Sequence, residues 1–277
     1  NYLLENFKEE DRLDEFTESV LEGFENNKPQ LKPVPVNKLS FVVSTNGKKE
    51  KKTQRLINSI HRTMTDFPYE VIVSGVTDFV EDAHKVEASE DAENGMLAKL
   101  RHLGAKKAKG DVLVFVDDDF LFPEDWNKKF LKFTSENGWN VLSNKILLPD
   151  GSRFWDRATK SPHQLVSYDH SKYDANLYNT GGFWIVRMET YAKTPWDISL
   201  PIYADKLGLV NEDIKMSEDM QKAGNFLEFD KNNYVWHDDN SYVEFQNVTI
   251  KKELARQYGF EWEPPMSESY KKDLLDL

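Results

Sequence analysis

The chain has 277 residues, of which 39% are hydrophobic and 30% charged, so it is long enough to bury a core and is not disordered. Its formal net charge of −12 argues against a nucleic-acid binder, which needs a concentrated basic surface. The lack of cysteine excludes disulfides, zinc–thiolate sites and thiol nucleophiles. No apolar run of about 18 residues and no signal-peptide pattern occurs, so we expect no membrane span and a cytoplasmic location. Any peripheral attachment to a membrane would come from parts outside this chain.

The N-terminal segment is predicted to be helical. Residues 1–27 place apolar side chains at roughly helical spacing between acidic ones, which predicts one or two amphipathic helices. Pro29, Pro33 and Pro35 then interrupt any helix, so an extended connector should follow. We assign residues 1–37 to this helical arm and connector, 38–245 to the main domain and 246–277 to a helical tail.

The main domain shows alternating strand and helix patterns. Buried-type strands are predicted at residues 39–45, 69–75 and 111–117, and helices at 52–64 and 96–107. Further strands are expected at residues 140–148 and 182–186, and further helices at 214–223 and 250–258. Strands joined through helices by short connections predict an α/β fold with a mostly parallel sheet. In such open sheets, ligands bind at the carboxyl ends of the strands.

Three consecutive aspartates follow the third of these strands. Asp117, Asp118 and Asp119 repel one another, and partial burial would raise their pKa values further. A divalent cation removes this conflict, because Mg²⁺ and Mn²⁺ prefer carboxylate oxygens and bridge them to phosphate-bearing substrates. The alternative is a solvated acidic turn.

These segments together resemble glycosyltransferases of the GT-A fold, and family 2 in particular, over roughly residues 38–240. The first strand and helix resemble the family's nucleotide-binding unit, and the stretch ending in Asp117-x-Asp119 resembles its metal motif after a helix carrying Arg101. Two positions depart from the family pattern, with Ser74 in place of an aspartate and His102 in place of an asparagine.

Two later motifs strengthen the resemblance. The sequence NEDIKMSEDMQKAG places Glu212 and Asp213 at a helix start, and YVWHDD places His237 at a strand end. By resemblance, Asp213 with Glu212 forms the catalytic pair, and Asp213 takes the proton of the attacking hydroxyl in an inverting displacement. A helix N-terminal carboxylate that only favours the helix dipole is the alternative for Asp213.

The resemblance also assigns binding roles. The metal, Mn²⁺ or Mg²⁺, is expected at Asp117, Asp119 and His237, although a lone histidine can equally be structural. The nucleotide is expected to contact a set of side chains near the strand ends: Ser44, Thr45, Ser74, Arg101, Asp117 and Asp118.

The acceptor is expected near the segment NTGGFWIV. Gly181 and Gly182 would let the backbone approach a sugar, and Trp184 could offer a flat face to it, although a tryptophan in an apolar strand is usually core. A preceding loop carries Arg153, Trp155, Arg157 and Lys160, which could close over a diphosphate, recognise an anionic acceptor, or simply be solvated.

The partners implied are a nucleotide-diphosphate sugar donor and a hydroxyl acceptor, either a glycan, a lipid-linked molecule or another alcohol. A retaining GT-A transferase is the first alternative. A haloacid-dehalogenase-type phosphatase is disfavoured because two strand–helix units precede the aspartates. A sugar nucleotidyltransferase is disfavoured because it should carry a glycine-rich phosphate loop after the first strand, whereas STNGKKEKK has a single glycine. A carbohydrate-binding module would not need Asp117, Asp119 and Asp213. The sequence leaves the donor base, the sugar, the linkage and the oligomeric state open.

Overall fold

The computed structural model describes residues 31–202, 208–238, 242–245, 248–251 and 266–275. From Pro33 onward, the described residues form one compact unit. The helices expected in residues 1–27 lie outside the described residues. No helix in the described part of the chain is long and apolar enough to cross a membrane.

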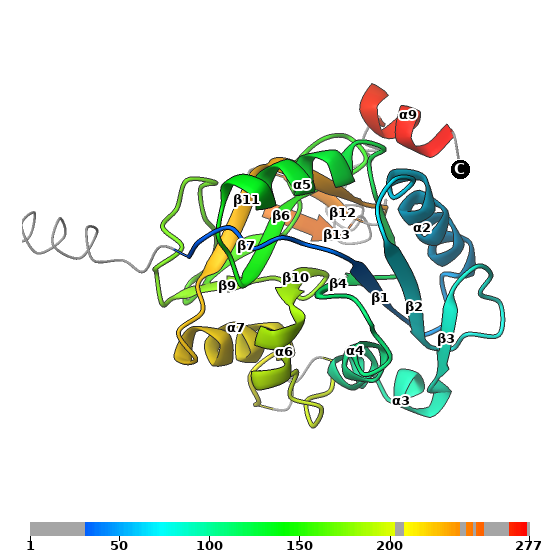
Figure 1. The fold of residues 1–277 in the computed structure, drawn as a ribbon, viewed down its shortest axis with the longest axis horizontal. Helices are drawn as coiled ribbons and strands as arrows, with labels where there is room; N and C mark the ends of the chain where they lie inside the picture. Colours follow the sequence, from blue (N-terminus) through cyan, green and yellow to red (C-terminus); the bar gives the residue numbers. More distant parts are fainter. Residues whose placement is uncertain (1–30, 203–207, 239–241, 246–247, 252–265, 276–277) are drawn as a thin grey trace, which may run out of the picture. The chain divides into compact units, whose positions relative to one another are not determined.

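An eight-stranded mixed sheet lies at the centre of this unit (Figure 1), with the strand order β3-β2-β1-β4-β10-β6-β11-β5. Strand β10 runs antiparallel to both of its neighbours and β5 runs antiparallel to β11, whereas the other pairs are parallel. The predicted α/β fold with a mostly parallel sheet is therefore confirmed. The strands are β1 (Leu39–Thr45), β2 (Tyr69–Gly75), β3 (His84–Glu87), β4 (Val112–Asp117), β5 (Phe120–Leu121), β6 (Val141–Leu147), β10 (Phe183–Arg187) and β11 (Leu227–His237).

Helices cover both faces of the sheet (Figure 1). Helices α2 (Glu50–Thr63) and α5 (Trp126–Glu136) contribute to one hydrophobic cluster. Helices α4 (Leu97–Ala105), α6 (Met188–Lys193) and α7 (Glu212–Lys222) contribute to the other. The short helix α3 (Ser89–Glu93) precedes α4.

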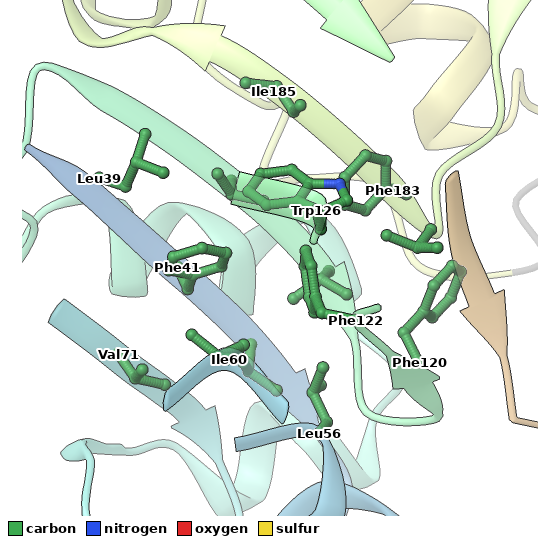
Figure 2. Packing of buried hydrophobic residues seen from close by; sticks show 14 of the residues in the cluster. Leu39, Phe41, Leu56, Ile60, Val71, Phe120, Phe122, Trp126, Phe183 and Ile185 are labelled. Carbon is green, nitrogen blue, oxygen red and sulfur yellow. The ribbon is translucent and has the colours of Figure 1, made fainter. Parts of the chain in front are cut away.

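The two clusters follow from side-chain alternation along the central strands. In β4, Val112, Val114 and Val116 belong to the cluster under α2 and α5, whereas Leu113 and Phe115 belong to the cluster under α4 and α7. Figure 2 shows the first cluster, in which the rings of Phe41, Phe122, Trp126 and Phe183 lie together. Since both faces are buried, the central strands carry near-continuous apolar runs.

Smaller elements complete the unit. A three-stranded sheet has the order β8-β7-β9, and a two-stranded hairpin joins β12 to β13. The helix predicted at residues 250–258 is wrong at its start, because Ile250 and Lys251 pair in the hairpin; residues 252–258 lie outside the described residues. The bounds are β7 (Arg157–Lys160), β8 (His163–Leu165), β9 (Leu177–Asn179), β12 (Tyr242–Phe245), β13 (Val248–Lys251) and α9 (Glu268–Leu275).

Candidate active site

The candidate site lies where β1 and β4 end side by side. The two strands are parallel, and Ser44 near the end of β1 pairs in register with Asp117 at the end of β4. Since Val116 faces α2 and α5, the alternation directs Asp117 toward the face covered by α4. Asp118 and Asp119 then follow in the turn that leads to β5. The aspartate triplet therefore lies at the carboxyl edge of the sheet, as the sequence predicts.

Arg101 on α4 connects the triplet to the start of α7. Its Nη2 donates to Asp117 Oδ1 at 2.9 Å and its Nη1 to Glu212 Oε1 at 3.4 Å. The side chain of Arg101 is only 1% exposed, and its guanidinium lies 4.8 Å from the centre of the Trp196 ring. A single buried cation thus holds together carboxylates that are far apart in the sequence.

Asp118 is the middle carboxyl of the triplet, and it is buried. Thr45 Oγ1 donates to its Oδ2 at 2.7 Å. Burial raises the pKa of Asp118 to about 7, and the neighbouring Asp119 and Asp117 act in the same direction. Near neutral pH this carboxyl therefore carries a proton part of the time, which reduces the repulsion within the triplet.

Asp119 faces a basic side chain and an imidazole. Its Oδ2 accepts the Lys49 ammonium and lies 3.6 Å from His237 Nε2. Its carbonyl oxygen accepts the backbone N–H of Asp238 at 2.6 Å, which holds the end of β11 against the triplet. The His237 ring stacks on Phe154 with a centroid distance of 4.1 Å, so its orientation is fixed by packing.

Asp213 lies in the first turn of α7 and faces the glycine pair. The backbone N–H of Gly181 donates to its Oδ2 at 3.1 Å, and that of Ile214 donates to its Oδ1 at 2.7 Å. Burial, together with the adjacent Glu212, raises the pKa of Asp213 to about 7. A carboxyl with such a pKa can exchange a proton near neutral pH.

The two glycines lie where a side chain would be crowded. A Cβ on Gly181 would lie 3.2 Å from Glu212 Oε1, and one on Gly182 would lie 3.0 Å from the Phe120 ring. The carbonyl of Gly182 also accepts the backbone N–H of Asp117 at 3.1 Å. The glycine pair therefore joins the aspartate triplet to Asp213 through the backbone.

Two pockets open at this site. The first, of about 350 Å³, extends from the triplet to α3 and α4; its polar lining consists of Ser44, Thr45, Asn46, Lys49, Asp117, Asp118, Asp119 and His237. Its apolar lining includes Ala92, Leu97, Leu100 and Ile202. The second pocket, of about 390 Å³, is lined by Asp117, Phe120, Ile146, Phe154, Trp155, Thr180, Gly182 and His237. Asp117 and His237 line both pockets, so the two are adjacent.

Two predicted site residues lie in the interior instead. Ser74 is fully buried, and its hydroxyl donates to the Leu100 carbonyl at 2.8 Å beneath α4. Trp184 is also fully buried and packs edge-on against Trp196, at a centroid distance of 5.5 Å. Strand β10 lies between two other strands with both faces covered, so this tryptophan cannot offer a face to an acceptor.

The arginines of the predicted loop are engaged internally. Arg153 pairs with the buried Asp156 and donates to the Val166 carbonyl at 2.7 Å. Arg157 is buried and donates to the carbonyls of His170 and Leu227. Lys160 contacts Glu218 at 3.7 Å. Trp155 lines the second pocket together with Phe154 of the same loop, and its Nε1 donates to Tyr178 Oη at 2.9 Å.

Several residues at the site were not identified from the sequence. Lys49 lies in a lysine-rich stretch that resembles an ordinary solvated loop. Asp238 is buried next to His237, where it accepts the Tyr270 hydroxyl of α9 and pairs with Arg55 of α2 at 2.6 Å. No local pattern indicates these contacts, because they join segments distant in the sequence.

The predicted three-residue metal site is not formed as expected. Within the residues that the structure describes, no group of three or more His, Asp or Glu side chains is arranged to hold one ion. Asp117 is directed to Arg101 rather than to Asp119 and His237. The remaining pair does fit a cation, because Asp119 Oδ2 and His237 Nε2, 3.6 Å apart, can both lie at metal–ligand distances of about 2.1 Å from one ion. Mg²⁺-type sites commonly use one or two protein ligands and complete their coordination with substrate phosphates and water.

Comparison with known families finds one match. The model of glycosyl transferase family 2 matches residues 40–194, more than half of the chain. No curated protein sequence matches the chain.

Solved structures share the fold. S. aureus TarS residues 1–349 in complex with UDP-GlcNAc superposes with a TM-score of 0.51 at 20% identity, covering 74% of this chain and 62% of that one. GalNAc-T7 with UDP, GalNAc and Mn²⁺ gives a TM-score of 0.55 at 16% identity, covering 73% of this chain and 43% of that one. This chain thus matches less than two thirds of the length of either.

Proposed function

Since the chain belongs to glycosyl transferase family 2 and is therefore a glycosyltransferase, we propose that it moves a sugar from a nucleoside diphosphate donor to an acceptor hydroxyl with inversion. The observation that carries this proposal is the contact of Arg101 with both Asp117 and Glu212. It brings the aspartate triplet and the carboxylate pair of α7 into one site, where a donor and a base can act on the same acceptor.

The first pocket is the proposed donor site. Its apolar wall at Leu97, Leu100 and Ile202 suits a base or ribose, and its polar end at the triplet suits a diphosphate. The buried Ser44 hydroxyl lines this pocket and has no hydrogen-bond partner among the described residues, so it can bond to the donor. We propose a UDP-sugar, because the structures of similar fold include UDP and UDP-GlcNAc complexes.

We further propose Mn²⁺ or Mg²⁺ at Asp119 and His237, in line with the Mn²⁺ in the GalNAc-T7 complex. When bound, such an ion neutralises the charge that develops on the departing diphosphate. Asp117 does not belong to this pair; held by Arg101 at the boundary between the two pockets, it orients the sugar of the donor.

Asp213 is the proposed general base. Its oxygens accept two backbone N–H groups, so its position is fixed before the acceptor arrives. The hydroxyl of the acceptor gives its proton to Asp213 as the oxygen attacks the anomeric carbon. Glu212 supports this role, because its negative charge adds to the burial that raises the pKa of Asp213. A base on the acceptor side with direct attack on the donor gives inversion.

The second pocket is the proposed acceptor site. Trp155 and Phe154 form part of its wall, and aromatic faces suit the apolar face of a sugar ring. Gly182 and Phe120 both line this pocket, and a side chain on Gly182 would crowd the Phe120 ring. Arg153 and Arg157 are engaged with internal partners, so we propose an uncharged sugar or polyol as the acceptor.

A donor screen tests this function. Purified protein is incubated with UDP-sugars with Mn²⁺ or with EDTA, and UDP release is measured with and without simple sugars as acceptors. We expect metal-dependent release that an acceptor accelerates, and a product of inverted configuration by NMR. Release that is equal in EDTA would contradict the metal, and a retained configuration would contradict Asp213 as the base.

A further inference from the structure

Lys49 places a positive charge inside the proposed donor pocket. It immediately precedes α2, in the lysine-rich stretch between β1 and α2. Its side chain is 40% exposed and its ammonium contacts Asp119 Oδ2, whereas the Asp119 side chain is only 6% exposed. Among the described residues that line this pocket, Lys49 is the one lysine or arginine.

One oxygen of Asp119 contacts Lys49 and also belongs to the proposed ion site. Asp119 Oδ2 accepts Lys49 and is also the oxygen that lies 3.6 Å from His237 Nε2. An ion shared by Asp119 and His237 would therefore lie close to the Lys49 ammonium, and the two positive charges would repel each other. Lys49 and the ion cannot both bind this oxygen closely.

We propose that Lys49 neutralises Asp119 in the substrate-free enzyme and moves to the diphosphate of the donor when a divalent ion takes its place. This role rests on the donor and metal sites of the proposed function. A lysine is suited to it, because its flexible stem lets a point charge move between neighbouring anions. The diphosphate offers such anions in the same pocket at the moment when Asp119 is taken by the ion.

The exchange makes metal and nucleotide binding depend on each other. Without nucleotide, the ion must displace Lys49 from Asp119 and leave the ammonium without this partner. With nucleotide, the displaced ammonium gains a phosphate contact, so the ion binds more tightly. By linkage, the ion then strengthens nucleotide binding by the same factor.

The test compares Lys49→Met with Lys48→Met. Both variants remove one positive charge, but Lys48 is exposed and does not line the pocket. Free Mn²⁺ is measured by electron paramagnetic resonance during titration with and without UDP, and UDP affinity is measured by calorimetry at saturating Mn²⁺. Thermal unfolding in EDTA checks that each variant is folded, and Lys49→Arg serves as the charge-conserving variant.

We expect Lys49→Met to bind Mn²⁺ about tenfold more tightly without UDP, and UDP about tenfold more weakly with Mn²⁺, the size of one charge-assisted hydrogen bond. Lys48→Met should match the wild type in both, and Lys49→Arg should stay closer to the wild type than Lys49→Met. If the wild type binds UDP with Mn²⁺ but Lys49→Met behaves like Lys48→Met, the role of Lys49 is wrong and the donor site stands. If the wild type does not bind UDP, the proposed donor is wrong, and the role of Lys49 with it.

Discussion

Replacing Asp213 with asparagine keeps the size of the side chain but removes its ability to take a proton. In the wild type, the two carboxylate oxygens accept the N–H groups of Ile214 at 2.7 Å and Gly181 at 3.1 Å. An asparagine has one acceptor oxygen and one NH₂ donor, so it can keep the shorter bond and loses the longer. We expect kcat to fall by about 10²–10⁴-fold, the usual contribution of a general base, while the Kd of the donor is unchanged.

The pH dependence of kcat/KM gives a second test of Asp213 as the base. The pKa of Asp213 is raised to about 7. The carboxyl is then about one-tenth ionised at pH 6 and about nine-tenths at pH 8, so kcat/KM of the wild type should rise about tenfold over this interval. The residual activity of Asp213→Asn should show no such rise. UDP release from a UDP-sugar, followed across this pH range, measures both proteins.

The stability of the two proteins should diverge over the same range. The folded-state pKa of Asp213 lies above its ordinary value of 3.8, so the wild type loses stability as the pH rises toward and through 7. Asparagine does not ionise, so Asp213→Asn should gain stability relative to the wild type from pH 5 to pH 8. Turnover of the variant within about threefold of wild type, or a flat wild-type profile, would refute the assignment of Asp213 as the base.

Three further substitutions test the site. Asp118→Asn should raise the Tm more at pH 8 than at pH 5, because the pKa of Asp118 is raised to about 7 and its ionisation costs folding free energy as the pH rises; an equal change at both pH values would contradict this. Arg101→Met should lower the free energy of unfolding by about 3–5 kcal/mol, because it leaves Asp117 and Glu212 without their shared cation. Urea unfolding measures this free energy, and a loss below about 1 kcal/mol would count against the bridge. Trp155→Ala should raise the acceptor KM while donor hydrolysis without acceptor stays unchanged, and a parallel loss of both activities would exclude an acceptor role.

The fold could be predicted wherever apolar runs were long. Strands β1, β2, β4, β6 and β10 lie close to their predicted ranges, because both faces of the sheet are covered and the pattern is strong. The three-stranded sheet was not predicted, since its strands are only three or four residues long and mix polar with apolar residues. The start of the helix expected from Ile250 was wrong, because Ile250 and Lys251 lie in β13 and apolar spacing in a short segment does not distinguish a helix from a strand.

The site was predictable where a residue type and a strand end coincide. Asp117 ends a buried strand and Asp119 lies two residues beyond it. Both line one pocket with His237, and Arg101 connects Asp117 to the start of α7, where Asp213 lies. For Trp184, the burial agrees with the alternative that a tryptophan in an apolar strand is usually core. Ser74 could not be placed from local sequence, because its burial depends on α4, which packs on the sheet from elsewhere in the chain. The role of Lys49 could not be predicted either, because its partner Asp119 lies 70 positions away in the sequence.

The bridge formed by Arg101 has a consequence for how this enzyme could diversify. A guanidinium is a planar, rigid group, so Arg101 helps to fix the separation between Asp117 and the start of α7, together with the backbone contacts of Gly181 and Gly182. Residues around either pocket can then change without altering that separation. The sugar preference of the two pockets could thus change while the spacing of these carboxylates stays constant.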